Sequence, residues 1–272
     1  MFTANHFRRS RVLLILLGVA GCGGGSETPA GPDIQTREVT YQQNGTPLKG
    51  FIAWDASRPG KRPGVLVVHE WWGHNDHARN AARRLAEAGY VGFALDMYGD
   101  GKQTTHPDTA QQFMAQATAD LSVLVARFNA ARAELLKDPQ VDSTRIGAIG
   151  YCFGGAVVLG QARAGADLDA VVSFHGALLP GEVDSGVVKA RVLVLTGADD
   201  PMVPNTAVET FQKEMTAAGA GGLTQIVVYP GAKHSFTNPH ADSVGMAALG
   251  YNSAADQQSW QAMLKLFHEV WP

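Results

Sequence analysis

The sequence predicts a single α/β domain with a mostly parallel sheet and helices on both of its faces. Two observations support this prediction. Short apolar runs rich in valine recur along the chain, and segments with helical spacing of apolar residues lie between them. Such runs suit parallel strands, because helices bury both faces of a parallel sheet. The regular alternation of strands and helices then favours one α/β domain.

An antiparallel hairpin is expected to open this domain. The extended-looking runs "REVTYQ" and "PLKGFIAWD" flank a segment that contains Asn44-Gly45. Asn-Gly readily takes the positive φ angles that a tight hairpin turn requires.

Six buried strands and several helices are expected after the hairpin. The apolar runs that predict the strands span residues 64–70, 91–97, 145–151, 169–176, 191–197 and 224–230. The segment "HARNAARRLAEAG" has one apolar face and ends at Gly89, which suits a helix C-terminus. The run from Pro107 to the residue before Pro139 predicts one long helix or a pair of helices, and "GAVVLGQAR", "NTAVETFQKEMTAAG" and "SAADQQSWQAMLKLFHEV" predict further ones.

The first residues are typical of an export signal. Arginines in "MFTANHFRRSR" precede the apolar run "VLLILLG", which is too short to span a bilayer as a mature helix. The run ends at "VAGC", which resembles the lipobox of bacterial lipoproteins. We therefore expect a signal peptide at residues 1–21 and lipidation of Cys22, against the alternative of an ordinary signal peptide with a coincidental cysteine.

A tether and an envelope location follow from that interpretation. Residues 22–33, with "GGGSETPAGPD", are too rich in glycine, proline and small polar residues to fold, so the α/β domain is expected at 34–272. The predicted location is the bacterial cell envelope, with a membrane anchor at Cys22. By resemblance to lipoprotein sorting, Gly23 in place of aspartate favours the outer membrane if the cell is diderm.

Composition gives no indication of a nucleic-acid partner. The formal net charge is only -3, and no basic run occurs beyond the first residues. Cys22 and Cys152 are the two cysteines of the chain. If Cys22 is acylated, Cys152 has no disulfide partner within the chain, so its thiol must be buried or useful.

The stretch "GAIGYCFGGA" fits a turn that presents a nucleophile. Gly150, Cys152 and Gly154 form a Gly-x-nucleophile-x-Gly pattern between a predicted strand and a predicted helix. Small neighbours permit the sharp turn, and the helix N-terminus lowers thiol pKa values and offers backbone N–H groups to an oxyanion. The alternative is a structural cysteine packed beside glycines.

An acid and a histidine follow later strands. "ADDPMVP" places Asp199 and Asp200 after one strand, and "YPGAKHSF" places His234 after the last. Each signal is weak alone, because the acids could cap a helix and the histidine could be solvated. The order nucleophile, acid, histidine is the order that an α/β-hydrolase requires, so together they predict a Cys-Asp-His triad.

No metal or cofactor site is predicted. "HEWWGH" differs from the H-E-x-x-H zinc motif, because its second histidine comes one residue late and follows a strand. "GDGKQT" lacks the spacing of a phosphate-binding P-loop.

These motifs resemble those of the dienelactone hydrolase family of α/β-hydrolases. The resemblance spans about residues 37–271 and rests on "VVHEWWG", "ALDMYGDG", "GYCFGG", "GADDPMVP" and "HSFTNPHAD". It implies the α/β-hydrolase fold and a triad of Cys152, Asp200 and His234, with Asp200 preferred because it directly precedes "PMVP".

The resemblance also implies roles for residues around the thiol. Glu70 falls on the family carboxylate that holds the resting thiol uncharged until substrate binds. The backbone N–H groups of Trp71 and Phe153 fall on the oxyanion donors.

Two departures bear on the substrate. Family members that cleave dienelactone bind its carboxylate with two arginines, and here Gly99 to Lys102 and Asn238 occupy those regions. Without these arginines a neutral ester or lactone is the expected substrate. The residues expected to contact it, besides Trp71, are Trp72, Tyr98, Phe236 and Asn238.

The sequence thus predicts a lipid-anchored hydrolase that cleaves a carboxylic ester or lactone through an acyl-enzyme on Cys152. Three alternatives stay open: a thioesterase, a non-catalytic envelope binding lipoprotein on a hydrolase scaffold, and a redox-sensing thiol protein. Nothing in the sequence specifies the oligomeric state.

Overall fold

The computed structural model describes residues 1–2 and 31–272, and Pro32–Pro272 form one compact unit. The expected signal peptide, the lipidated Cys22 and nearly all of the expected tether lie outside the described residues, so these features stay predictions. None of the described helices combines the length and the apolar character needed to cross a membrane.

The sheet has eight strands in the order β1-β2-β4-β3-β5-β6-β7-β8. β1 and β2 are antiparallel, β2 also runs antiparallel to β4, and all pairs from β4 to β8 are parallel. The strands are β1 (Ile34–Gln43), β2 (Thr46–Asp55), β3 (Arg62–Val68), β4 (Val91–Leu95), β5 (Val141–Tyr151), β6 (Ala170–Phe174), β7 (Arg191–Gly197) and β8 (Thr224–Tyr229). The predicted fold class is confirmed.

The expected hairpin forms at Asn44-Gly45. Both residues have positive φ, 46° and 78°, so the chain reverses in two residues. The pairing runs in continuous register from Ile34 opposite Asp55 to Gln43 opposite Thr46.

Six α-helices accompany the sheet in the described part of the chain. They are α1 (Asp76–Glu87), α2 (Pro107–Thr118), α3 (Leu121–Leu135), α4 (Phe153–Arg163), α5 (Asn205–Ala217) and α6 (Ser253–Val270), with short 3₁₀ turns at Gly221–Leu223 and Ala241–Val244. The segment after Pro107 forms a pair of helices, because the Asp120 side chain accepts the Ser122 N–H at 2.8 Å and caps α3.

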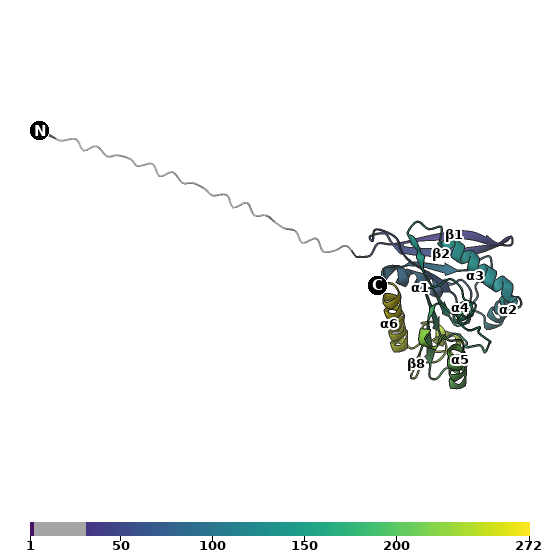
Figure 1. Cartoon of the computed structure of the whole chain (residues 1–272). Helices are drawn as coiled ribbons and strands as arrows, with labels where there is room; N and C mark the ends of the chain where they lie inside the picture. Colours follow the sequence, from purple (N-terminus) through teal and green to yellow (C-terminus); the bar gives the residue numbers. More distant parts are fainter. Residues whose placement is uncertain (3–30) are drawn as a thin grey trace. The chain divides into compact units, whose positions relative to one another are not determined.

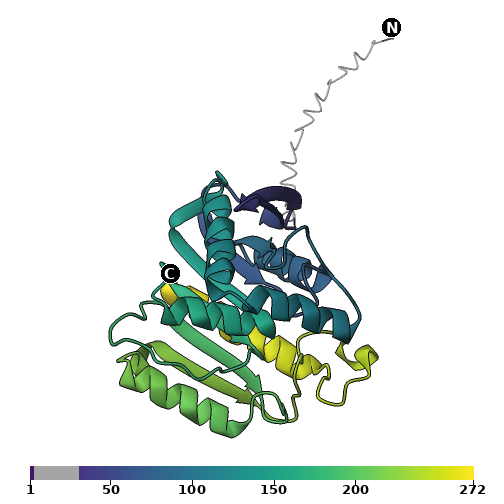
Figure 2. The same ribbon diagram turned by 90° about the vertical axis from the view of Figure 1, so that its right-hand side faces the viewer.

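Two layers of helices enclose the sheet. Along β3, Val65 and Val67 pack with residues of α1 and α6, whereas Leu66 and Val68 pack with residues of α3, α4 and α5. This alternation follows from the two-residue period of a strand, and here both faces are apolar. Figure 1 shows α1 and α6 on one side of the sheet and α3 and α5 on the other, and Figure 2 turns the latter side toward the viewer.

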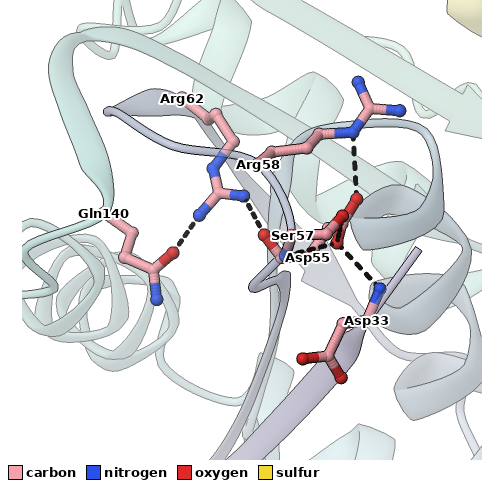
Figure 3. A network of polar contacts seen from close by, with 6 residues as sticks. All are labelled: Asp33, Asp55, Ser57, Arg58, Arg62 and Gln140. Atoms are coloured by element: carbon pink, nitrogen blue, oxygen red, sulfur yellow. Dashed lines mark hydrogen bonds and ion pairs between the residues drawn. The ribbon is translucent and has the colours of Figure 1, made fainter. Parts of the chain in front are cut away.

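A polar network joins β2 to the beginning of β3 and β5 (Figure 3). Arg62, at the start of β3, donates to the backbone carbonyl of Asp55 and to the side chain of Gln140. The hydroxyl and N–H of Ser57 donate to the Asp55 carboxylate, and this holds its pKa at about 2. These contacts fix the amino ends of the parallel strands, at the opposite edge of the sheet from the loops that follow β3 and β5.

Close packing of α4 against β3 generates a test of the fold. A Cβ added at Gly154 would lie 2.3 Å from the Val68 carbonyl oxygen, whereas one added at Gly160 on the same helix would have nothing within 4 Å. We expect Gly154→Ala to lower the free energy of unfolding by about 3 kcal/mol. The matched Gly160→Ala should raise it by about 1 kcal/mol through helix propensity. Urea denaturation measures both, and equal stability of the two variants would contradict this packing.

Candidate active site

Four predicted functional residues follow the carboxyl ends of four parallel strands. Glu70 follows β3, Cys152 follows β5, Asp200 follows β7 and His234 follows β8. The carboxyl ends of parallel strands meet at one edge of a sheet, which is where open α/β sheets bind their ligands.

Cys152 occupies a strained turn between β5 and α4. Its φ of 53° and ψ of -115° lie outside the regions that L-residues favour, at a cost of about 1–3 kcal/mol. Its N–H donates to the Phe174 carbonyl at 3.0 Å and to His175 Nδ1 at 3.2 Å. These two bonds from the neighbouring strand hold the turn, and the half-buried thiol lies at the N-terminus of α4.

The glycines around Cys152 are required by backbone contacts. A Cβ at Gly150 would lie 2.0 Å from the Gly154 carbonyl oxygen, and one at Gly155 would lie 2.7 Å from the Cα of Gly176. The helix therefore begins directly against the strands, and the motif that the sequence presents has a steric cause.

Asp200 and His234 form a buried pair. The Nδ1 atom of His234 lies 2.8 Å from Asp200 Oδ2, and the other carboxylate oxygen accepts the Met202 N–H at 2.8 Å. Asp199 is exposed, so His234 pairs with Asp200, the acid that the sequence favours. Among the described residues, the buried Nε2 of His234 has no partner that meets hydrogen-bond geometry.

The site favours a positively charged His234. Burial lowers the pKa of this imidazole, but the negative charge of Cys152 and the bond to Asp200 outweigh it and raise the pKa to about 10. Cys152 and His234 line the same pocket. The arrangement can therefore hold a thiolate beside an imidazolium whose Nε2–H is not bound to any other described residue.

His175 is a site residue that the sequence analysis missed. It is fully buried with φ 41°, its Nδ1 accepts the Cys152 N–H, and its Nε2 lies 2.8 Å from Thr237 Oγ1. Burial, together with the charge of His234, keeps the pKa of His175 well below its ordinary value. Its ring is neutral, with Nε2–H donating to Thr237, and it positions the turn that carries the thiol. Its place directly after β6 was the signal that could have revealed it.

Glu70 lies buried against the loop that carries His234. Ser235 Oγ donates to one carboxylate oxygen at 2.9 Å, and Asn238 Nδ2 donates to the other at 2.7 Å. No hydrogen bond joins Glu70 to Cys152 among the described residues, so the thiol-restraining role stays a prediction. Through these two hydrogen bonds, Glu70 holds the loop that carries His234 against the end of β3.

The N–H groups of Trp71 and Phe153, the two expected oxyanion donors, do not donate to any acceptor in the described part of the chain. Phe153 is the first residue of α4, where N–H groups lack intrahelical partners. The Trp71 carbonyl accepts the Tyr98 hydroxyl at 3.1 Å, which holds the peptide after Trp71 in place. Oxyanion binding by these N–H groups stays a prediction.

An apolar pocket of about 710 Å³ opens above the thiol. Its wall includes residues of α2, α3 and α4 together with Cys152 and His234. The aliphatic and aromatic side chains that line it include Trp71, Met114, Leu121, Leu124, Val125, Phe153, Val157, Leu179, Met202, Phe211 and Leu249. Besides His234, Arg163 is the one basic side chain among the described lining residues. Its guanidinium already donates to Glu214 at 2.6 Å and lies 4.8 Å from the Phe211 ring centroid.

The lining of this pocket differs from the sequence expectation. Trp72, Tyr98, Phe236 and Asn238 are not on its wall, because packing or hydrogen bonding places each of them in the interior. Trp72 packs with Leu249, and the Tyr98 hydroxyl is bound to a carbonyl. Asn238 is bound to Glu70. Substrate contact by these four side chains thus has no support from the pocket, whereas Trp71 does line it.

The histidines of "HEWWGH" have backbone partners. His69 Nε2 accepts the Met97 N–H at 3.2 Å, and burial lowers the pKa of His69 to about 4. His74 Nε2 lies 3.0 Å from the Ala94 carbonyl oxygen and therefore donates to it. Neither ring is free to bind an ion, and the described residues contain no group of three or more potential metal ligands.

The model of the dienelactone hydrolase family matches residues 48–271. The chain belongs to the dienelactone hydrolase family. Membership of this family makes the protein a carboxylic ester hydrolase, which acts on esters or lactones. "Protein usf" of Aquifex pyrophilus is 29% identical over 239 residues, covering 85% of this chain and 97% of that protein. A Yersinia pestis protein, named as a candidate carboxymethylenebutenolidase, is 30% identical over 247 residues, covering 86% and 88%.

Solved structures of family members have the same fold. The structure "m3DLH" is 41% identical, covers 88% of this chain and 99% of its own, and superposes with a TM-score of 0.83. A dienelactone hydrolase-like promiscuous phosphotriesterase, P91 from metagenomic libraries, is 39% identical with a TM-score of 0.83 and covers 87% and 98%.

The pKa of His234 is directly testable. Asp200→Asn removes a charge that raises this pKa, so we expect the imidazole of the variant to lose its proton at lower pH than that of the parent, which stays protonated through neutral pH. Imidazole carbon and proton shifts followed by NMR against pH measure this, with His234→Gln to assign the signal. If the His234 imidazole lost its proton at the same pH in the parent and in Asp200→Asn, the pairing of His234 with Asp200 would be contradicted.

Proposed function

We propose that this hydrolase cleaves a neutral carboxylic ester or lactone through a thioester acyl-enzyme on Cys152, with His234 as acid–base and Asp200 as its orienting partner. One observation carries the proposal. A thiol on a strained turn at the start of α4 shares an apolar pocket with a histidine whose other nitrogen is bound to a buried aspartate.

Acylation requires one proton to pass from His234 to the leaving alcohol. The thiol proton resides on His234 Nε2 before substrate binds, and Sγ attacks the ester carbonyl carbon as a thiolate. The tetrahedral oxyanion is held by the N–H groups of Trp71 and Phe153. When the carbon–oxygen bond to the alcohol breaks, Nε2 returns its proton to the leaving oxygen. Asp200 stabilises the imidazolium throughout.

Deacylation repeats these steps with water. His234 Nε2 removes a proton from water as the oxygen attacks the thioester carbonyl. Collapse of the intermediate breaks the carbon–sulfur bond and releases Sγ as a thiolate, while Nε2 keeps the proton taken from water. The product is a carboxylic acid, and the thiolate beside the imidazolium is restored.

The electrostatics of the pocket favour an uncharged substrate. A carboxylate ligand needs an unpaired cation, and the Arg163 guanidinium is already bound to Glu214. Asn238, at one of the positions where relatives that cleave dienelactone have arginine, donates to Glu70 instead. Binding a carboxylate in this apolar site would therefore bury an uncompensated charge.

Phosphotriester hydrolysis is a second candidate activity. The same apolar pocket suits a neutral triester, and P91 at 39% identity is described as a promiscuous phosphotriesterase. Attack of Sγ on phosphorus would displace an aryl alcohol, and water would then release a phosphodiester and the thiol.

Turnover of a matched panel tests the proposal. We expect the parent to hydrolyse p-nitrophenyl butyrate and Cys152→Ala to lose at least about 1,000-fold in kcat/KM. Butyryl thiocholine and diethyl p-nitrophenyl phosphate complete the panel and place thioester and phosphotriester hydrolysis relative to ester hydrolysis.

Two outcomes would contradict it. Undiminished turnover by Cys152→Ala would refute the thiol mechanism. No turnover of any of the three substrates by a folded parent would favour a non-catalytic binding protein.

A further inference from the structure

We infer that the pocket selects esters with an extended hydrocarbon acyl chain, which lies along α4 from Cys152 toward Arg163. This inference rests on the proposed function and names its substrate class. It follows from the shape of the pocket, from its exposed rim and from one glycine on its wall.

The pocket follows the length of α4. Cys152, Ala156 and Gly160 line it, each four residues after the last, and Arg163 lines its far end. Residues four apart lie on one face of a helix, so the pocket extends along a helix about 16 Å long. Its volume of about 710 Å³ is far larger than a short acyl group such as acetyl needs.

The two ends of the pocket differ in chemistry. One end of the pocket lies at the triad and is lined by Met202 and Leu249. The Met202 N–H donates to Asp200, and Leu249 forms an isolated β-bridge with His234. Leu179, whose carbonyl accepts from Arg163, marks the other end. The leaving alcohol must take its proton from His234, so it belongs at the triad end. The stretch along α4 contains no general acid and is left for the acyl chain.

The rim of the pocket is apolar and open to solvent. Five large apolar side chains of residues 31–272 are exposed, and four of them line this pocket. The four are Leu121 (66% exposed), Val125 (37%), Leu179 (62%) and Met202 (46%). Such a concentration on one opening marks a surface that an apolar ligand covers. An acyl chain that enters here buries both itself and the part of the rim formed by Leu121, Val125 and Leu179.

Gly160 keeps the part of the pocket between Ala156 and Arg163 open. It is exposed on α4, and a Cβ at this position would meet no protein atom within 4 Å, although glycine is costly inside a helix. A larger side chain here would occupy the pocket without disturbing the core. Gly160 is thus a specificity-determining position for chain length.

The test is an acyl-length series of p-nitrophenyl esters, acetate, butyrate, hexanoate and octanoate, with the full chain. We expect kcat/KM of the parent to rise about threefold with each added methylene. Gly160→Leu should lower the octanoate-to-acetate ratio of kcat/KM by at least about tenfold. Gly222→Leu is the matched control, because Gly222 is also exposed, has nothing within 4 Å of an added Cβ and lies off this pocket. Its ratio should equal that of the parent.

The outcomes separate this inference from the proposed function. A flat length profile, or equal ratios in the two leucine variants, overturns the acyl-chain inference while Cys152-dependent hydrolysis of acetate stands. A series of alkyl acetates is the second arm. A gain with alcohol length that Gly160→Leu removes, with no gain from acyl length, overturns the acyl assignment. Absence of turnover of every ester by the parent would instead refute the proposed function.

Discussion

The strained turn at Cys152 is the constraint on which the rest of the site depends. Because α4 begins against the carbonyl oxygens at the end of β3, the chain must turn from strand to helix within one residue. That residue has positive φ, and its side chain lies at the helix N-terminus. The bonds from its N–H to β6 and to neutral His175 offset the strain. Together these contacts hold the thiol in one place before any substrate binds.

Two buried carboxylates fix His234 and its loop at the same edge of the sheet as Cys152. Asp200 fixes one nitrogen of His234, and Glu70 fixes the loop of His234 through Ser235 and Asn238. A buried carboxylate with two hydrogen-bond donors is satisfied and rigid, whereas one without them would be costly. The polar network around Arg62 lies at the opposite edge of the sheet from these loops.

Much of the fold, and the meeting of Asp200 with His234, could be predicted from the sequence, because both depend on local signals in chain order. Short apolar runs predicted all six parallel strands, Asn44-Gly45 predicted the hairpin, and strand-end positions predicted that Asp200 and His234 would meet. The pocket could not be predicted in the same way. Trp72, Tyr98 and Phe236 follow strands as substrate-binding residues do, but tertiary packing buries them. The actual wall comes from side chains of α2, α3, α4 and α5, which tertiary packing brings together around one opening and which no local sequence signal marks.

Acyl transfer to Cys152 can be observed by acid-quenched intact-mass spectrometry after mixing with p-nitrophenyl butyrate. We expect the parent to gain the mass of one butyryl group, located on the peptide that contains Cys152, and Cys152→Ala to gain none. Turnover without any adduct on the parent, or the same adduct on Cys152→Ala, would contradict it.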